Sequence, residues 1–462
     1  MGDAPIAAMS VASLVAGYRE GDLSPVEVAS AYLERIKQFN GELNAFVQVN
    51  AEEAMQQAVE AESLYASGDP TPPLLGVPTS VKDAFHMRGL PTTIGSLVHQ
   101  GQISKNDSGV VRRLRAAGAV FTGKTNTAEF GQSATTDNLL GSATGNPWDP
   151  RRTPGGSSGG AAASVAAGLS AIAVGSDGGG SVRIPAAFTG IYGFKPSPGR
   201  CPDEKGFRAM TDFVSAGPMT NSVADARILL GVLSETAFPR TDVTGLRVAY
   251  CRFPEGRAVD PGVAAAVQVA ANTLGELGHE VIETDLPLEG WNDVFGPLVL
   301  EDEHRERGHL LTHVPNLITG YERSTLRAAL RLDPAEVERA QALLPEYRRR
   351  IDELFERYDL LLTPTVAVPA FPLGERPTHV AGVAVDQLWG AFPFAVPFNV
   401  AGVAAASLPC GLAAGMPVGA QLVARSGAEQ LLLDASESLE EALAFDRAAL
   451  RERWRLGRPV AV

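Results

Sequence analysis

A serine that follows three consecutive glycines is the feature of this sequence that most directly indicates chemistry. The segment from Gly175 onward reads GSDGGGSVRIP and follows an apolar, strand-like run, AIAV. Gly178, Gly179 and Gly180 free the backbone to adopt unusual angles, so their N–H groups can converge on one point, as an oxyanion hole requires. Ser181 stands at the end of this array, where a nucleophile belongs. A plain glycine turn between a strand and a helix is the alternative interpretation.

A second serine, Ser157, lies at the centre of a GxSxG pattern in the segment GGSSG. A nucleophile elbow needs a strand that leads directly into the turn. The preceding residues read NPWDPRRTP, and so many prolines exclude a central strand. The elbow also needs a downstream Asp and His, and no histidine has a convincing setting. The pattern favours a glycine-rich turn that opens a Gly/Ala helix.

The segment GAVFTGKT, from Gly118 to Thr125, matches the P-loop pattern GxxxxGK[ST] letter for letter. A P-loop needs a strand before its first glycine and a flexible loop between its two glycines. Here a helical pattern, VVRRLRAAG, ends at Gly118, and the strand-like AVF falls inside the supposed loop. Gly118 is therefore predicted to be a helix C-cap, and nucleotide binding is not expected.

Taken together, several segments resemble the amidase signature family, and the likeness covers nearly the whole chain. The matching stretches are GVPTSVKD at 76–83, GKTN at 123–126, EF at 129–130, NPW at 146–148, PGGSSGG at 154–160, SDGGGS at 176–181, RIP at 183–185 and GFKP at 193–196, with weaker likeness at VPFN 396–399, MPVG 416–419 and QLV 421–423. The resemblance also accounts for the GKT letters as a family feature without a nucleotide role.

The resemblance implies a role for each member of a Ser-Ser-Lys relay. The family's nucleophile corresponds to Ser181, its bridging serine, which follows a cis peptide, to Ser157, and its general base to Lys82. Its oxyanion-hole backbone corresponds to the three glycines and Ser181. The supporting positions correspond to Ser158, Asp177 and Arg183. One departure is Gly178, where the family often has threonine.

The implied relay is chemically coherent. A serine hydroxyl needs a base to become a nucleophile, and lysine can serve only when burial lowers its pKa from about 10.4 toward about 7–8. The apolar or small residues at 76–81 and 158–167 are consistent with a desolvated site. In isolation, Lys82 beside Asp83 would be interpreted as a surface lysine, but both serine motifs favour catalysis. An acyl-enzyme that water clears is the expected intermediate.

The family includes free-standing amidases and the glutaminase subunit of tRNA-dependent amidotransferases. The subunit usually carries Arg-Gln-Pro where this chain has RIP at 183–185, and an acidic residue just before the VPFN segment. Here residues 388–394 read LWGAFPF without charge, and the nearest acid is Asp386. Trp389, Phe392 and Phe394 are predicted to line an apolar substrate pocket, with ordinary core as the alternative. We therefore expect a free-standing amidase acting on an apolar or aryl amide, and the second hypothesis is the glutaminase subunit. An intact triad argues against a non-catalytic binding protein.

The elements around these residues predict an α/β fold. Apolar runs at 77–81, 119–121, 171–174, 246–250, 280–283, 360–362 and 419–423 indicate strands, and helical patterns lie at 108–117, 223–233, 261–277, 334–358 and 429–443. This alternation favours a central mixed sheet covered by helices on both faces. Residues 1–70, with a helix starting at Ser24-Pro25 and ending near Gln38, are expected to wrap onto a single domain spanning 71–462, with a helical insertion near 300–350.

Composition limits the classes of function. The chain of 462 residues carries a formal charge of −14, which repels phosphate backbones and anionic membranes, so neither nucleic acid nor a membrane is expected as a partner. Three widely spaced cysteines and no CxxC motif predict neither disulfides nor zinc, and a cytoplasmic location. The charged segment at 301–309, with His304 and His309, is interpreted as a solvated helix face. A small-molecule amide is the expected partner, no cofactor or metal is expected, and the oligomeric state stays open, a homodimer included.

Overall fold

One large mixed sheet runs through the molecule. The computed structural model describes residues 6–456, and eleven strands follow one another across the sheet in the order β1-β3-β2-β4-β6-β5-β12-β13-β9-β7-β8. The strands are β1 (Phe46–Val49), β2 (Pro78–Lys82), β3 (Val120–Thr125), β4 (Ile172–Asp177), β5 (Tyr192–Lys195), β6 (Ser215–Thr220), β7 (Arg247–Tyr250), β8 (Glu280–Glu283), β9 (Leu360–Pro364), β12 (Ala404–Ala413) and β13 (Met416–Ala424). A separate small hairpin joins β10 (His379–Val380) to β11 (Val383–Ala384).

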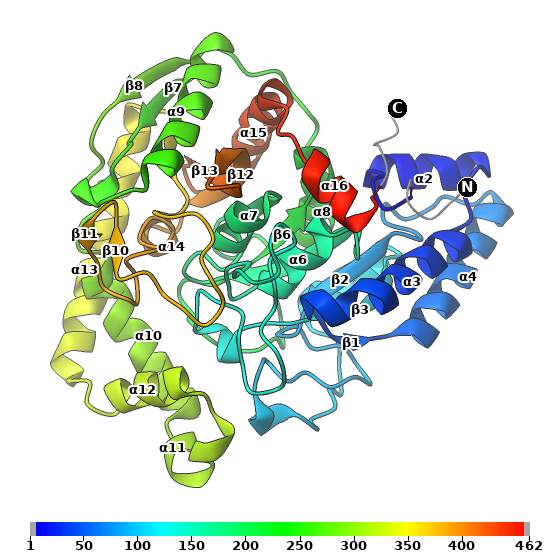
Figure 1. The fold of residues 1–462 in the computed structure, drawn as a ribbon, viewed down its shortest axis with the longest axis horizontal. Coiled ribbons are helices and arrows are strands. Elements are labelled where there is room, and N and C mark those ends of the chain that lie inside the picture. The colour runs from blue at the N-terminus through cyan, green and yellow to red at the C-terminus, as the bar shows by residue number, and fades with distance from the viewer. Residues whose placement is uncertain (1–5, 457–462) are drawn as a thin grey trace.

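Helices cover both faces of the sheet (Figure 1). They are α2 (Val11–Glu20), α3 (Pro25–Leu43), α4 (Ala51–Ser67), α5 (Gly109–Ala116), α6 (Gly159–Ala166), α7 (Arg183–Thr189), α8 (Val223–Ser234), α9 (Pro261–Glu276), α10 (Trp291–Arg307), α11 (Leu310–His313), α12 (Gly320–Ala329), α13 (Pro334–Asp352), α14 (Val396–Val400), α15 (Glu429–Leu443) and α16 (Ala448–Trp454). Among residues 6–456, none of these helices combines the length and apolar character needed to cross a membrane.

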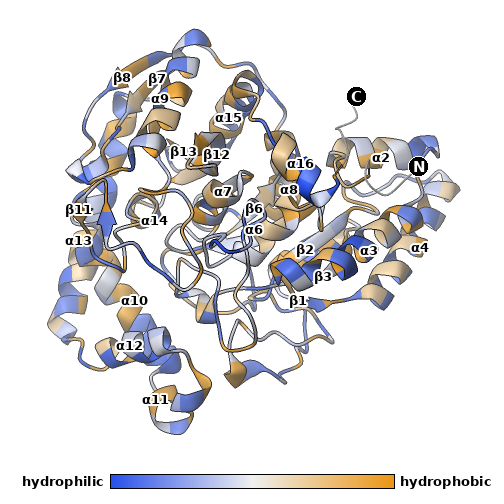
Figure 2. Cartoon of the chain, viewed as in Figure 1, coloured by the Kyte–Doolittle hydropathy of each residue, from blue (hydrophilic) through white to orange (hydrophobic). Residues whose placement is uncertain are grey.

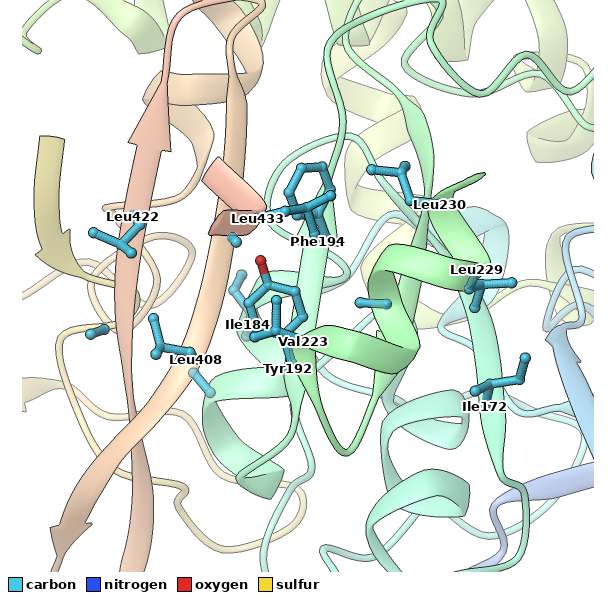
Figure 3. Packing of buried hydrophobic residues seen from close by; sticks show 14 of the residues in the cluster. Ile172, Ile184, Tyr192, Phe194, Val223, Leu229, Leu230, Leu408, Leu422 and Leu433 are labelled. Carbon is cyan, nitrogen blue, oxygen red and sulfur yellow. The ribbon is translucent and has the colours of Figure 1, made fainter. Parts of the chain in front are cut away.

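Side chains that alternate along the strands show that both faces are buried. Leu360 and Leu362 of β9 join the largest core cluster, whereas Leu361 between them joins a second cluster. Successive side chains of a strand point to opposite faces, so the two clusters lie on opposite sides of the sheet. Figure 3 shows part of the largest cluster, in which Ile172 of β4 and Leu422 of β13 contribute with side chains from the covering helices. The predicted α/β class with a mixed, doubly covered sheet is confirmed.

The N-terminal segment contributes a strand as well as helices. The helix predicted at Ser24-Pro25 begins there, because Ser24 accepts hydrogen bonds from the N–H groups of Val26 and Glu27. It runs beyond Gln38 to Leu43. The short strand β1 then pairs antiparallel with β3 at the edge of the sheet. Its four residues are too short a pattern to recognise locally, so the prediction of a purely helical wrap over residues 1–70 was incomplete.

The helical insertion predicted near 300–350 is present and begins earlier. Helices α10 to α13 project together from the body, away from the N-terminal helices α2 to α4 (Figure 1). Hydrophilic side chains are prominent along α12 in this projection (Figure 2). Helix α10 packs against α12, α13 and α14, so the insertion is anchored to the main body beside the sheet.

Two central strands, β6 and β12, were not predicted. Strand β6 reads SAGPMT and lies between β4 and β5, with Pro218 opposite Val174. Its pairing with β5 covers only Met219 and Thr220, so Pro218 lies where β6 has a strand partner on one side only. Strand β12, AAASLPCGLA, is rich in alanine, which has low β propensity. Burial on both faces holds these sequences extended despite their weak local preference.

Candidate active site

Parallel pairing of β2 with β4 brings a lysine to the future catalytic edge. Lys82 is the last residue of β2, and Asp177 is the last residue of β4. The carboxyl ends of adjacent parallel strands open at the same edge of a sheet, where α/β proteins place ligand sites. There, Lys82 Nζ donates hydrogen bonds to Ser157 Oγ at 2.6 Å and to Ser176 Oγ at 2.9 Å.

Burial sets the protonation state of Lys82. The side chain is fully buried, and this desolvation lowers the pKa of Lys82 from 10.5 to about 7, against the attraction of Asp177, which raises it. Desolvation disfavours the charged form of an amine. A large fraction of Lys82 is therefore neutral near pH 7 and able to accept a proton.

Two adjacent serines connect the lysine to the glycine-rich loop. Ser157 lies just before helix α6, and the Gly156–Ser157 peptide bond is cis. The Ser158 N–H donates to the Ser181 carbonyl at 3.2 Å. The Ser158 hydroxyl donates to the Ser176 carbonyl at 3.2 Å and accepts from the Ser176 N–H at 3.3 Å. Ser158 thus holds the end of β4 and the Ser181 backbone beside Ser157, as a supporting residue would.

The glycine-rich loop combines free space with one engaged amide. Gly180 has a φ of 108°, a conformation that favours glycine, and a Cβ there would lie 2.6 Å from the Ala395 Cβ. The Gly180 N–H donates to Asp177 Oδ1 at 2.7 Å. Because this amide is already bound by a carboxylate, the N–H groups of Gly178, Gly179 and Ser181 are the better candidates for an oxyanion hole.

A buried ion pair beneath the loop fixes its shape. Arg183 and Asp177 are both fully buried, and the guanidinium Nε and Nη2 each donate to the carboxylate at 2.9 Å. Burial alone would raise the pKa of Asp177, but Arg183 holds that pKa below its ordinary value. Arg183 Nη1 also donates to Gln421 Oε1 at 2.7 Å, and Asn399 Nδ2 donates to Asp177 Oδ1 at 2.9 Å. The ion pair therefore has the additional hydrogen bonds that a buried pair needs.

The catalytic candidates line one cavity of about 240 Å³. Lys82, Ser157 and Ser181 all contribute to its wall, and the nucleophile candidate Ser181 is 8% exposed. The aromatic and thioether side chains of the cavity are Phe85, Phe130, Phe207 and Met210. No sequence pattern singled out these four for the cavity, although Phe130 belongs to the EF pair and Phe85 closely follows Lys82. Ser176, which bonds Lys82, was recognised only as part of a motif.

The predicted aromatic pocket residues take other places. Phe392 and Phe394 are fully buried, and the Phe392 ring packs against Phe188 and Phe371 with centroids 6.1 and 5.8 Å apart. Neither lines the catalytic cavity, so their assignment to the substrate pocket was wrong: the chain turns them into the core. Trp389 is half-buried and lines a neighbouring cleft instead.

The other motifs have structural explanations. The GKT letters lie within β3, and Lys124 is fully buried, with its Nζ 2.5 Å from Asp83 Oδ1. The residues between the two glycines form a strand rather than a phosphate-binding loop, as predicted. Among residues 6–456, no group of three or more His, Cys, Asp or Glu side chains could hold a metal ion. The cysteines are buried, unpaired thiols.

Comparisons with known proteins agree with this geometry. The sequence model of the amidase family matches residues 27–433. The A chain of a glutamyl-tRNA(Gln) amidotransferase from Salinispora tropica is 34% identical over 483 residues, spanning 94% of this chain and 97% of that protein. An acylamidase from Rhodococcus erythropolis is also 34% identical, over 460 residues, spanning 94% and 95%. The solved structure of a bacterial aryl acylamidase of the amidase signature family has a TM-score of 0.86 and 28% identity, over 98% of this chain and 99% of that chain.

The chain therefore belongs to the amidase family. It is an amide-hydrolysing enzyme. Equal identity to an acylamidase and to a component of an amidotransferase means that overall similarity does not separate these two roles. The distinction depends on individual residues around the cavity.

Proposed function

We propose that this chain is a free-standing amidase that cleaves an apolar or aryl amide through an acyl-enzyme on Ser181. The observation that carries the proposal is the 2.6 Å contact between Lys82 Nζ and Ser157 Oγ, made by a fully buried lysine whose pKa is lowered to about 7. A base of this pKa suits proton transfer near neutral pH.

In the first half of the proposed reaction, Ser181 Oγ attacks the amide carbonyl carbon. Ser157 accepts the Ser181 proton while its own proton passes to Lys82. The carbonyl oxygen becomes an oxyanion, which accepts hydrogen bonds from the N–H groups of Gly178, Gly179 and Ser181. Donors that are positioned before the reaction stabilise such a charge without reorganisation.

The C–N bond then breaks, and the proton held by Lys82 returns through Ser157 to the leaving amine nitrogen. The carbonyl re-forms as an ester of Ser181. Water attacks this acyl-enzyme with the same relay as base, and the Ser181–acyl bond breaks to release the carboxylic acid. Each half-reaction restores neutral Lys82.

The apolar wall supports the substrate class. Phe85, Phe130 and Phe207 line the cavity with Met210, and apolar walls with few polar groups are typical of small-molecule sites. Asp203 is the acidic residue among the described lining residues. Its Oδ1 accepts the Val110 N–H at 3.0 Å, so it already caps the start of a helix.

The glutaminase subunit remains the second candidate function because relatives named as amidotransferase components are as similar as the acylamidase. Against it stands the position of Asp386. Its Oδ1 accepts the N–H groups of Leu388 at 3.0 Å and Trp389 at 2.6 Å. The Asp386 side chain is not among the residues that line the catalytic cavity, so it gives no support for binding a glutamine amino group there.

The decisive experiment incubates the purified protein alone with glutamine, a primary aliphatic amide, benzamide and an anilide, and measures ammonia or aniline release. Ser181→Ala and Lys82→Ala are expected to lose the activity on benzamide or the anilide. Lys105→Ala, which removes an exposed lysine outside the catalytic cavity, is the matched control and should retain it.

Turnover of glutamine alone, or turnover only after partner proteins are supplied, would support the amidotransferase role instead. Full activity in Ser181→Ala would refute the assigned nucleophile and return attention to Ser157. Full activity in Lys82→Ala would refute the relay.

A further inference from the structure

A second cavity adjoins the catalytic one and is more apolar. This cleft of about 420 Å³ is lined by Phe295, Val299 and Leu300 from α10, by Ala328 from α12, and by Leu388 and Trp389. Phe295 and Trp389 pack ring to ring with centroids 5.8 Å apart. Met210 lines both the cleft and the catalytic cavity, so its side chain stands between them.

The walls of the cleft touch the catalytic loop directly. A Cβ added at Gly178 would lie 2.6 Å from Met210 Sδ, and one added at Gly179 would lie 3.2 Å from the Phe295 ring. Met210 and Phe295 therefore pack on the two glycines whose N–H groups face the reaction. This contact also explains the additional glycine of the loop, since a side chain at residue 178 would have to displace Met210.

Size indicates that the two cavities serve one ligand. Small-molecule sites usually have volumes of roughly 300–1,000 Å³. The catalytic cavity of about 240 Å³ is below this range, whereas the two cavities together fall inside it. A substrate longer than a small amide would need the adjoining space.

We propose that the cleft between α10, α12 and Trp389 binds a distal, unbranched apolar arm of the amide substrate, and that Met210 is the partition that limits how long this arm can be. The proposal rests on the proposed amidase function and adds a specificity-determining residue to it. The arm belongs either to the acyl group or to the amine, and both share the same chemistry.

Met210 suits this role because its position is held while its side chain can move. Thr211, the next residue, donates from its N–H and its hydroxyl to Asp302 Oδ2 of α10 at 2.8 and 2.7 Å. The Met210 side chain is unbranched and adapts to its surroundings. Its φ of 49° lies in the left-handed region, which glycine adopts without strain. Met210→Gly should thus remove the partition and keep the loop.

The test compares wild type, Met210→Gly, Met210→Leu and the double variant Met210→Gly/Ala328→Trp on two substrate series. One series holds p-nitroaniline fixed and lengthens a linear acyl group from acetyl to decanoyl. The other holds the acetyl group fixed and lengthens a linear amine over the same span. Ala328→Trp fills the cleft from α12 without touching the catalytic residues.

Met210→Gly is expected to raise kcat/KM for long members of one series by about fourfold for each additional methylene that enters the cleft. The shortest members should change less than about threefold. Met210→Leu, which keeps an apolar side chain of similar size, should behave like wild type. The double variant should lose the gain, and the series that responds identifies the half of the substrate that occupies the cleft.

Unchanged chain-length dependence in Met210→Gly for both series would refute the partition, as would a gain that survives Ala328→Trp. Either result could occur while short anilides are still hydrolysed in a Ser181-dependent manner, which leaves the proposed function standing. Absence of Ser181-dependent hydrolysis in every member of both series would instead refute the proposed function and the partition together.

Discussion

Replacing the buried lysine by methionine should stabilise the fold while abolishing activity. Lys82→Met keeps the length of the side chain and removes an amine that the protein holds without a carboxylate partner. A pKa lowered from 10.5 to about 7 corresponds to about 5 kcal/mol at 1.36 kcal/mol per unit. The hydroxyls of Ser157 and Ser176 lose their contact with Nζ, at about 1 kcal/mol each. We expect a net gain of about 3 kcal/mol in the free energy of unfolding at pH 7.

The sign of this effect with pH is specific. Between about pH 7 and 10.5 the unfolded state of the wild type binds the Lys82 proton and the folded state does not, so wild-type stability from this group falls as the pH is lowered through that window. Below about pH 7 both states are protonated and the difference stays constant. The advantage of Lys82→Met should therefore be full below about pH 7 and vanish above about pH 10.5.

Thermal unfolding measured from pH 6 to pH 10 tests the prediction. An unfolding entropy of about 2.1 cal/mol/K per residue gives about 1 kcal/mol/K for 462 residues, so Tm should rise by about 3 °C at pH 7. Lys124→Met is the matched control, because Lys124 is equally buried but pairs with Asp83, and removing it leaves a buried carboxylate that destabilises the fold. A lower Tm for Lys82→Met at pH 7, or a Tm difference independent of pH, would refute the reasoning.

Three further results are expected. The kcat/KM of the wild type should fall about tenfold per pH unit below an apparent pKa of about 7, because Lys82 must be neutral to accept a proton; a flat profile down to pH 5 would exclude Lys82 as the base. Arg183→Met leaves its buried carboxylate partner unpaired and should cost about 3–5 kcal/mol in chemical denaturation, with kcat reduced in any folded fraction; unchanged stability would contradict the role of this ion pair. Gly160→Ala places a Cβ 2.5 Å from the Asn126 backbone nitrogen and should destabilise by about 1–3 kcal/mol, whereas Gly41→Ala in an open helix position should stabilise slightly; equal effects of the two changes on Tm would show that α6 tolerates displacement.

Helices with local signals were predicted more accurately than central strands. Ser24 and Pro25 cap and open α3 as predicted, because the relevant hydrogen bonds lie within one turn. Strands β6 and β12 were missed because Pro218 and a run of alanines disfavour a strand locally. Their extended form depends on partners far along the chain, such as Gly193, opposite both Met219 of β6 and Ser407 of β12.

The sequence by itself determined which residues to propose for the relay, since Lys82, Ser157 and Ser181 each stand in a local pattern that survives without coordinates. Only the tertiary structure decided that Lys82 meets Ser157 and Ser176, which lie 75 and 94 residues away, and that burial there lowers its pKa. It also placed Phe392 in the core and Met210 against the glycine loop. Desolvation and cavity walls arise from the packing of distant segments, and no local pattern encodes that packing.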